Sequence, residues 1–426
     1  MIGEVFLKTI NHFFPQLTKW LKAIDDPRNK NKISYGTDHL IWLGIFLFLL
    51  RLGSKRKISY RLATEEFLEN LNFLCGDCRK SVAHHDTLAY LLSKLDPKEL
   101  SKVRQKMVYR LLRMKALAKF RLLRAYYLLA IDGTGHLVFK ERHCPFCLTK
   151  EKNGKILYYY HNVLEAKIVT DLGLAISVET EFILNREGAT KQDCELKAFY
   201  RLTERLKQRF PQLKICLLLD SLYAAAPVMD TLKRYHWKYI TTFKEGSLPE
   251  RYSEFLNLKK LDPQKERELV EDKTVRKYSW VNEMDHKGNF FDVIALQETT
   301  RAKKTSFVWM TNLRVTRDNI IPIAKGGRLR WKIENEGFNV QKNRGFNLEH
   351  PYSKKERAMK NFYLLLQIAY LISQLIEKGS LLKEKIEKVF GSVTMLFEQL
   401  LEELRTKSIA AHFSPKPIQI RLSSYP

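Results

Sequence analysis

Two apolar runs of strand length, each ending on an aspartate, constrain the fold of this chain more than any other feature. The run "LLAID" ends on Asp132, and the run "LKICLLLD" ends on Asp220. A carboxylate at the end of a buried strand is costly unless it is hydrogen-bonded, paired or bound to a metal ion. A lone aspartate at such a place is often only a turn residue or a helix cap. Two of them on neighbouring predicted strands indicate a common site where the strands end.

The sequence around these runs predicts an α/β fold with a mixed sheet. The segments "YYYHNVLEAKIV" and "LAISVETEFI", joined by "TDLG", are typical of a β-hairpin. Between the aspartates, "KQDCELKAFYRLTERLKQRF" has the spacing of an amphipathic helix. Asp193 and Glu195 lie at its start, where acidic residues favour the positive end of the helix dipole. After Asp220, the pattern predicts a helix and a further strand, which completes an α/β order.

Changes in pattern along the chain divide it into five expected segments. They are a basic, all-helical N-terminal domain at 1–122, the first part of the α/β core at 123–244, a β-rich insertion with charged loops at 245–315, two helices that close the core at 316–378, and a helical segment with a tail at 379–426.

The most apolar stretch, "LIWLGIFLFLL" at 40–50, is shorter than the ~18 residues expected of a membrane-spanning segment, so a buried core helix is expected there. The N-terminus lacks the pattern of a secretory signal peptide, and the expected location is therefore the cytoplasm, with no membrane partner.

The charge balance indicates a polyanionic partner. The chain has 74 Lys and Arg residues against 47 Asp and Glu residues, a formal net charge of +27 at pH 7. Charge of one sign on this scale opposes folding through self-repulsion and favours binding to nucleic acid. The alternative is a merely basic protein, because net charge informs partners and not fold.

A third carboxylate is expected beside the two aspartates, because Mg²⁺ binds oxygen ligands and two ions ~3.5–4 Å apart can act on the two sides of one phosphorus. The best candidate lies in "RLRWKIENEGFNVQKNRG". Arg330 and Glu334 are four residues apart and share a helix face, so Arg330 can grip a phosphate beside Glu334. Glu336 is the alternative, on roughly the opposite side of the helix.

Taken together, these residues resemble a known family. Asp132 in "AIDGTG", Asp220 in "LLLDS" and Glu334 in "RWKIENEGFN", with a β-rich insertion before the glutamate, are similar to the DDE transposases of bacterial insertion sequences, in their cut-and-paste branch. The resemblance covers about residues 125–375. It implies a ribonuclease-H-like fold in which Asp132, Asp220 and Glu334 are catalytic and hold two Mg²⁺ ions, with Mn²⁺ as an alternative.

The resemblance also implies a reaction and a partner. Water cleaves a phosphodiester at the end of the mobile element, and the freed 3′-OH then attacks target DNA, with no covalent enzyme intermediate. The expected assembly is a homodimer on paired DNA ends, associated with the bacterial nucleoid. Two alternatives stay open, a catalytically inactive DNA-binding relic of a transposase and a metal-dependent DNA nuclease that never joins strands.

The last helix of this branch carries the motif Y-x-x-R-x-x-x-E-x-x-x-x-x-x-K, and the chain matches it in part. Arg330 takes the place of the phosphate-binding arginine. The tyrosine position falls on Gly327 and the lysine position on Gln341, with Lys342 one residue later as the candidate DNA contact.

Family members also place a tryptophan of the insertion near a flipped base at the cleaved DNA end. Trp280 in "YSWVNE" is the candidate here, and Trp309 in "VWMTN" is the alternative. Either ring fits a hydrophobic core as well as a base platform.

Two Cys-x-x-Cys pairs, Cys75 with Cys78 and Cys144 with Cys147, raise the question of zinc. A four-thiolate site would need both pairs, and they lie much farther apart than the usual ~15–20 residues. The spacing therefore favours free thiols over structural zinc. His136 and His161 are interpreted as ordinary core or surface histidines.

Overall fold

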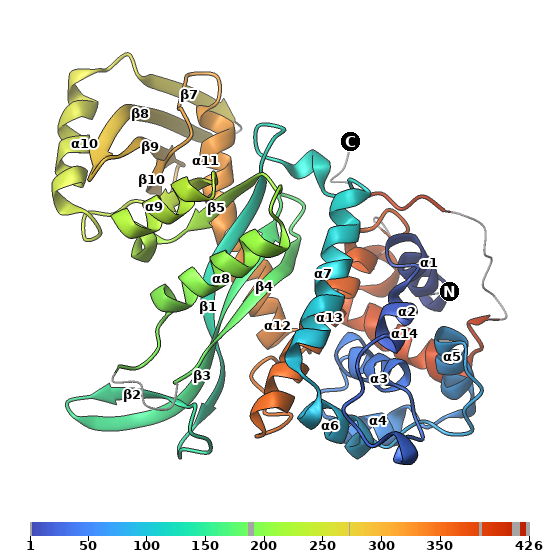
Figure 1. Ribbon diagram of the computed structural model, residues 1–426. Helices are drawn as coiled ribbons and strands as arrows, with labels where there is room; N and C mark the ends of the chain where they lie inside the picture. The colour runs from blue at the N-terminus through green and yellow to red at the C-terminus, as the bar shows by residue number, and fades with distance from the viewer. Residues whose placement is uncertain (1, 186–190, 272, 383–385, 411–417, 423–426) are drawn as a thin grey trace.

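The computed structural model describes residues 2–185, 191–271, 273–382, 386–410 and 418–422. A mixed sheet runs through the molecule, and a helical body packs against one part of it (Figure 1). Within the described chain the sheet has ten strands in the order β2-β3-β1-β5-β6-β10-β9-β8-β7, with β4 also paired to β3. The predicted α/β class, with a ribonuclease-H-like sheet and helical N-terminal part, is confirmed.

The part of the sheet that carries Asp132 and Asp220 is built from parallel and antiparallel neighbours. β1 pairs in parallel with β5, which pairs in parallel with β6, while β3 lies antiparallel to β1. β2 and β4 both pair antiparallel with β3. Their bounds are β1 Tyr127–Phe139, β2 Leu148–Lys152, β3 Lys155–Val169, β4 Ala175–Ile183, β5 Ile215–Leu219 and β6 Lys238–Thr242.

Helices cover this part of the sheet as the sequence predicts. The amphipathic α8 (Glu195–Arg209) packs on β3 and β4, and α9 (Ala226–Arg234) precedes β6. α11 (Ile320–Arg328) passes through a 3₁₀ turn (Leu329–Trp331) and a π-helical turn (Ile333–Phe338) into α12 (Asn339–Asn343).

The insertion extends the same sheet instead of forming a separate one. β10 pairs antiparallel with β6, with Met310 opposite Thr241. The strands are β7 Glu266–Glu271, β8 Thr274–His286, β9 Asn289–Thr299 and β10 Lys304–Thr311. β7 forms within "PQKERELVEDKT", where the sequence predicts a charged loop, and that expectation is wrong. α10 (Pro249–Leu261) is a helix that the expectation of a β-rich insertion did not include. Of the described residues of α10, Phe255 alone is buried, so no apolar stripe marks this helix.

The helical body is centred on α3 and α13, which pack against each other. All 13 residues of α3 are buried, as expected for a core helix. Among the described residues, no helix combines the length and the apolar character that a membrane crossing needs. The helices of this body are α1 Ile2–Phe13, α2 Leu17–Lys22, α3 Thr37–Leu49, α4 Arg56–Arg61, α5 Glu65–Cys75, α6 His85–Lys94, α7 Pro97–Arg113, α13 Glu356–Lys378 and α14 Val393–Thr406.

Short 3₁₀ turns at Lys30–Lys32, Ala118–Phe120 and Ser221–Tyr223 and a π-helical turn at Ile386–Phe390 complete the described elements.

A buried ion pair fixes the helical body to the sheet. Arg104 of α7 is 1% exposed and donates hydrogen bonds to Ser177 (2.7 Å) and Thr180 (2.5 Å) of β4. Its Nη1 atom lies 3.9 Å from Oε1 of Glu165, which is fully buried on β3. Glu165 is the cross-strand neighbour of Asp132. The N-terminal helices are therefore anchored directly beside the strand that carries the first aspartate.

Candidate active site

The sheet register brings Asp132 and Asp220 side by side. The last recorded pair of the parallel β1–β5 ladder is Ala130 with Leu218, and each aspartate stands two residues beyond it. Asp132 Oδ1 accepts a hydrogen bond from the Gly133 amide at 2.9 Å. Asp220 caps the 3₁₀ turn that follows β5 by accepting from the Leu222 amide at 2.8 Å. Since residues two apart point to the same face of a strand, both carboxylates share one side of the sheet.

Arg330 and Glu334 complete this group from the helical turns after α11. Arg330 Nη2 donates to Glu334 Oε1 at 2.8 Å, and its Nη1 lies 3.4 Å from Asp132 Oδ2. The residue is only 8% exposed. Glu334 lies in the π-helical turn, a local irregularity that is frequent at functional sites. The expected i, i+4 contact between Arg330 and Glu334 is thus present, and the Arg330 guanidinium also contacts Asp132.

Glu336 points to a different environment. Its carboxylate forms an ion pair with Lys332 at 2.8 Å and lies close to Gly173 in the β3–β4 turn. Its main-chain oxygen accepts a hydrogen bond from the hydroxyl of Tyr370. This geometry favours Glu334 over Glu336 as the third carboxylate.

The site concentrates negative charge in a partly buried place. Burial raises the pKa of Asp132 to about 7; Arg330 opposes this rise, and the nearby Glu334 adds to it. Burial and the charge of Asp220 raise the pKa of Glu195. The pKa of the buried Tyr223 hydroxyl is raised by burial and then by Glu195, Asp220 and Asp132. Neighbouring carboxylates repel one another, and a hard divalent cation bound between them relieves that repulsion and takes their oxygens as ligands.

Glu195 is the residue of this group that sequence reasoning missed. The sequence alone indicates an ordinary acidic residue at a helix start, and Glu195 does begin α8. Its carboxylate also reaches the strand, because a Cβ atom on Gly133 would lie 2.2 Å from Glu195 Oε1. The glycine directly after Asp132 was the available signal, since it marks a close approach to the backbone.

The family model described as the transposase DDE domain matches residues 124–372, more than half of the chain. The chain belongs to the DDE transposase family. Asp132, Asp220, Glu334 and the insertion between the last two all lie inside the matched region. Proteins of this family act on DNA and generally use divalent metal ions. No curated protein matches the chain.

The transposase departs from the family's motif at Gly327, and the structure gives the reason. A Cβ atom there would lie 2.8 Å from the indole ring of Trp309, which fills this space. Trp309 is 4% exposed and Trp280 7% exposed, and both belong to a second core between the insertion strands and α11. Neither ring presents much surface to DNA in this conformation, so the role of Trp280 at a DNA end stays a prediction.

The lysine position of the motif is also occupied differently. Gln341 is fully buried and bonded to Gln367 at 2.9 Å and to the ammonium of Lys167 at 3.4 Å. Lys167 comes from β3, and burial lowers its pKa to about 8. Lys342 is partly exposed and pairs with Glu349 at 2.8 Å. A polar core therefore replaces the family's lysine, and the DNA contact of Lys342 stays a prediction.

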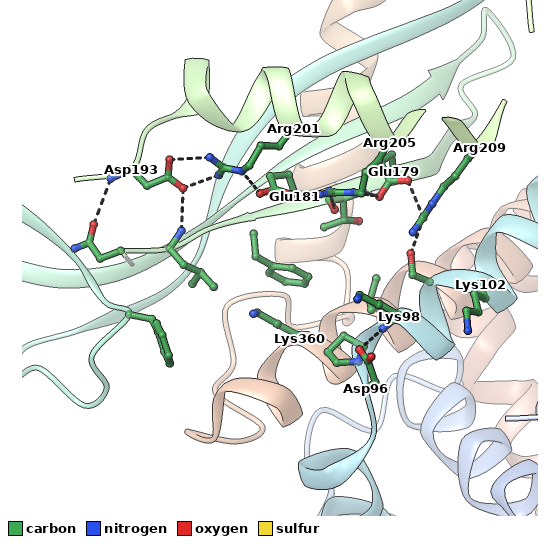
Figure 2. Close-up of a pocket in the computed structure, with 18 residues that line it drawn as sticks. Asp96, Lys98, Lys102, Glu179, Glu181, Asp193, Arg201, Arg205, Arg209 and Lys360 are labelled. Carbon is green, nitrogen blue, oxygen red and sulfur yellow. Dashed lines mark hydrogen bonds and ion pairs between the residues drawn. The ribbon is translucent and has the colours of Figure 1, made fainter. Parts of the chain in front are cut away.

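A separate cleft of about 490 Å³ lies between α7, β4, α8 and α13, and the three carboxylates do not line it. Figure 2 shows that its arginines face acidic partners. Arg201 pairs with Glu181 (2.5 Å) and Asp193 (2.6 Å), and Arg209 pairs with Glu179 (2.7 Å). Because these arginines are already paired, we assign the cleft a structural role at the junction of helices and sheet.

Proposed function

We propose that this transposase hydrolyses the phosphodiester bonds at its element ends in a Mg²⁺-dependent reaction. The freed 3′-OH would then attack a phosphodiester of target DNA, joining the element end to the target phosphate and releasing the target's 3′-oxygen as the leaving group. The observation that carries the proposal is that the buried guanidinium of Arg330 lies between Asp132 and Glu334, with Asp220 at the end of the strand next to the one that carries Asp132. A relic of a transposase would have no need to keep such a costly group of charges.

Asp132, Asp220 and Glu334 would hold two divalent ions, because all three offer carboxylate oxygens and the carboxyl of Asp132 has a raised pKa that a cation would relieve. Mg²⁺ is the expected ion, with Mn²⁺ as an alternative. When bound, such a pair of ions activates the attacking oxygen and stabilises the leaving oxygen of an in-line displacement.

Arg330 has two alternative partners in this proposal. Without DNA it neutralises Asp132 and Glu334, as the 3.4 and 2.8 Å contacts record. A guanidinium is also a strong bidentate ligand for phosphate. With cations compensating the carboxylates, Arg330 would be free to hold the phosphate that is being cleaved. The same residue would thus neutralise the carboxylates in the metal-free protein and position the substrate in the complex with DNA.

The basic surface would bind the rest of the DNA. A net charge of +27 supports strong, salt-dependent binding of the phosphate backbone. Lys342, on α12 close after Glu334, is proposed as one phosphate contact, exchanging Glu349 for DNA. Trp280 would reach a flipped base only if the insertion core rearranges on DNA. We further propose that two chains act together on paired DNA ends.

The test is cleavage and strand transfer on DNA that carries the ends flanking this gene, with Mg²⁺ or with EDTA. Asp132→Ala, Asp220→Ala and Glu334→Ala are expected to bind DNA but to abolish both steps. Glu336→Ala is the matched control, since its carboxylate pairs with Lys332 outside the site, and it should stay active.

Three outcomes would redirect the proposal. Loss of activity in Glu336→Ala, with Glu334→Ala active, would exchange the two glutamates. Cleaved ends without any joined product would identify a nuclease. A wild-type chain that binds the ends but yields no product with Mg²⁺ or Mn²⁺ would identify a relic.

A further inference from the structure

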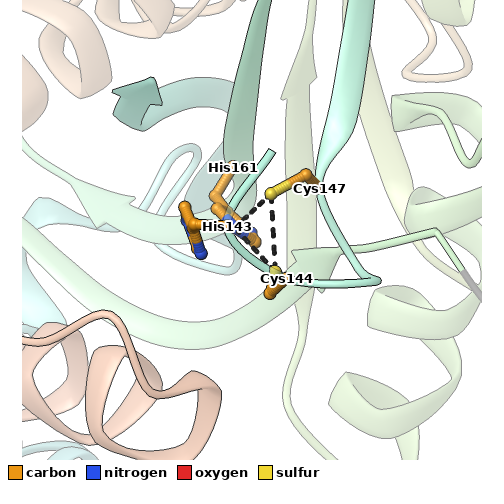
Figure 3. Close-up of side chains that lie close together, drawn as sticks. All are labelled: His143, Cys144, Cys147 and His161. Atoms are coloured by element: carbon orange, nitrogen blue, oxygen red, sulfur yellow. Dashed lines mark hydrogen bonds between the residues drawn. The ribbon is translucent and has the colours of Figure 1, made fainter. Parts of the chain in front are cut away.

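Four metal-ligating side chains meet at the far end of the strand that carries Asp132. They are His143, Cys144 and Cys147 from the loop between β1 and β2, and His161 from β3. Figure 3 shows the two thiols and the His161 ring facing one another, with His143 beside them. One ligand atom from each of the four side chains lies within 4.8 Å of the others.

The distances are close to the edges of a tetrahedral zinc site, with the two sulfurs somewhat nearer to each other than a bound ion would hold them. The Sγ atoms of Cys144 and Cys147 are 3.4 Å apart, and each lies 3.5 Å from Nε2 of His161. With Zn–S bonds of about 2.3 Å and Zn–N bonds of about 2.0–2.1 Å, a tetrahedron has S···N edges of about 3.5–3.6 Å and an S···S edge of about 3.8 Å. A disulfide is excluded as the explanation, because its sulfurs would lie about 2.03–2.05 Å apart, and both cysteines are free.

The fourth ligand position is also provided. Both ring nitrogens of His143 are shielded from solvent and lack a hydrogen-bond partner among the described residues. Its ring packs edge-on against Phe139 with centroids 4.0 Å apart, and its centroid lies 5.2 Å from that of His161. Since buried polar atoms rarely stay unpaired, a ligand for this imidazole is expected.

The turn that carries the two thiols is held in place by its own hydrogen bonds. Arg142 donates to the carbonyl oxygens of Cys144 (3.3 Å) and Pro145 (2.9 Å). Asn185, just after β4, donates from its side chain to the carbonyl of Cys147 at 2.8 Å and from its amide to that of Phe146 at 3.2 Å. The turn therefore holds both thiols in place, and hydrogen bonds around metal ligands orient those ligands in the same way.

We propose that His143, Cys144, Cys147 and His161 bind one structural Zn²⁺ ion. Four protein ligands leave no open position, which is typical of structural and not catalytic zinc. On binding, both thiols release their protons and coordinate as thiolates. The proposal departs from the sequence-based expectation of free thiols because that reasoning paired the two Cys-x-x-Cys motifs. Cys75 and Cys78 instead lie at and after the end of α5, and the second motif completes its set with histidines.

The ion would stiffen the part of the sheet that leads into the active site. His161 is aligned with Leu137, just past a register shift in the β1–β3 ladder that also pairs Asp132 with Glu165. A zinc ion bound by the β1–β2 loop and by β3 would hold β1 and β3 together at the end of their ladder that lies away from Asp132. The proposal does not depend on the catalytic roles, since its ligands are separate from the carboxylates.

The first test is the zinc content of the purified full-length chain by elemental mass spectrometry. We expect about one zinc per chain in the wild type and its loss in Cys144→Ser/Cys147→Ser. Cys75→Ser/Cys78→Ser is the matched control and should keep the metal. Asp132→Ala/Asp220→Ala should also keep it, which separates this ion from any held by the carboxylates. The proposal would be overturned if the zinc were lost in Asp132→Ala/Asp220→Ala but kept in Cys144→Ser/Cys147→Ser.

A second measurement protects the test against a variant that fails to fold. Wild-type protein is stripped with a chelator and titrated with Co²⁺ alone. Tetrahedral coordination by two thiolates should give thiolate-to-cobalt charge-transfer absorption with intense visible bands, and one equivalent of Zn²⁺ should abolish them. The same bands are expected in Cys75→Ser/Cys78→Ser. Their absence in the wild type would refute the site without reference to any variant.

Discussion

The carboxylate of Glu195 occupies the space beside Gly133 that the Cβ atom of any other residue would need. That Cβ atom would lie 2.2 Å from Oε1 of Glu195. Asp132 and Gly133 alternate along β1, so α8 brings Glu195 to the face of the sheet opposite Arg330 and Glu334. Glu195 is therefore a fourth carboxylate close to the site on that face, where burial and the charge of Asp220 raise its pKa.

Gly133→Ala should consequently reproduce the effect of Glu195→Gln. The methyl group displaces a flexible carboxylate at little cost to folding, and both variants weaken the negative field beside Asp220. We expect each to lower metal affinity or cleavage by roughly 10–100-fold, as outer-shell changes typically do. Mg²⁺ titrations of the cleavage rate measure this. Gly246→Ala, where an added Cβ meets nothing within 4 Å, is the control. A wild-type Mg²⁺ requirement in Gly133→Ala would remove Glu195 from the site.

Metal binding should depend on pH through Asp132. Its pKa is raised to about 7 in the metal-free protein, so a cation must displace a proton below that pH. Affinity for Mn²⁺ is expected to rise by up to about tenfold per pH unit between pH 6 and 7, and to level off above. Calorimetric titration of the DNA-free protein at several pH values measures the slope. An affinity that is constant over this range, or the same slope in Asp132→Asn, would contradict the assignment.

The same carboxyl should destabilise the metal-free fold at neutral pH. Its folded pKa of about 7 exceeds the unfolded value of about 3.9, so the native state binds the extra proton between these values. The free energy of unfolding therefore falls as the pH rises from about 4 to about 7, because the folded state then loses the proton that it binds more tightly than the unfolded state. Above pH 7 the decrease is complete. Asp132→Asn removes the effect and should melt a few degrees higher than wild type at pH 8, with a smaller difference at pH 5. Thermal unfolding in EDTA decides it, and a wild type that is the more stable at pH 8 would refute the argument.

The elements that sequence reasoning recovered are those with a strong local pattern. Apolar runs predicted β5, which ends just before Asp220, and the first half of β1. The expectation that β1 ends at Asp132 is wrong, because the strand continues to Phe139 beyond the apolar run. The four-residue spacing predicted the contact of Arg330 with Glu334. Glu195 and His161 escaped it because their neighbours are set by pairings between distant segments, which spacing along the chain does not encode. α10 escaped it because a helix that buries little needs no apolar stripe.

Gly327 and Trp309 form the pair that most directly tests how this chain departs from its family. The indole lies 2.8 Å from where a Cβ atom on Gly327 would stand, inside a core that includes Ile240. Gly327→Ala should therefore overpack this core and lower the free energy of unfolding by about 1–3 kcal/mol. Trp309→Leu alone should destabilise the protein by leaving a cavity. If the two side chains compete for one space, the double variant will be more stable than the sum of the single losses predicts, with a coupling of about 0.5–3 kcal/mol in urea unfolding. Additive losses would mean that the space beside Gly327 is not what excludes the tyrosine of the family motif.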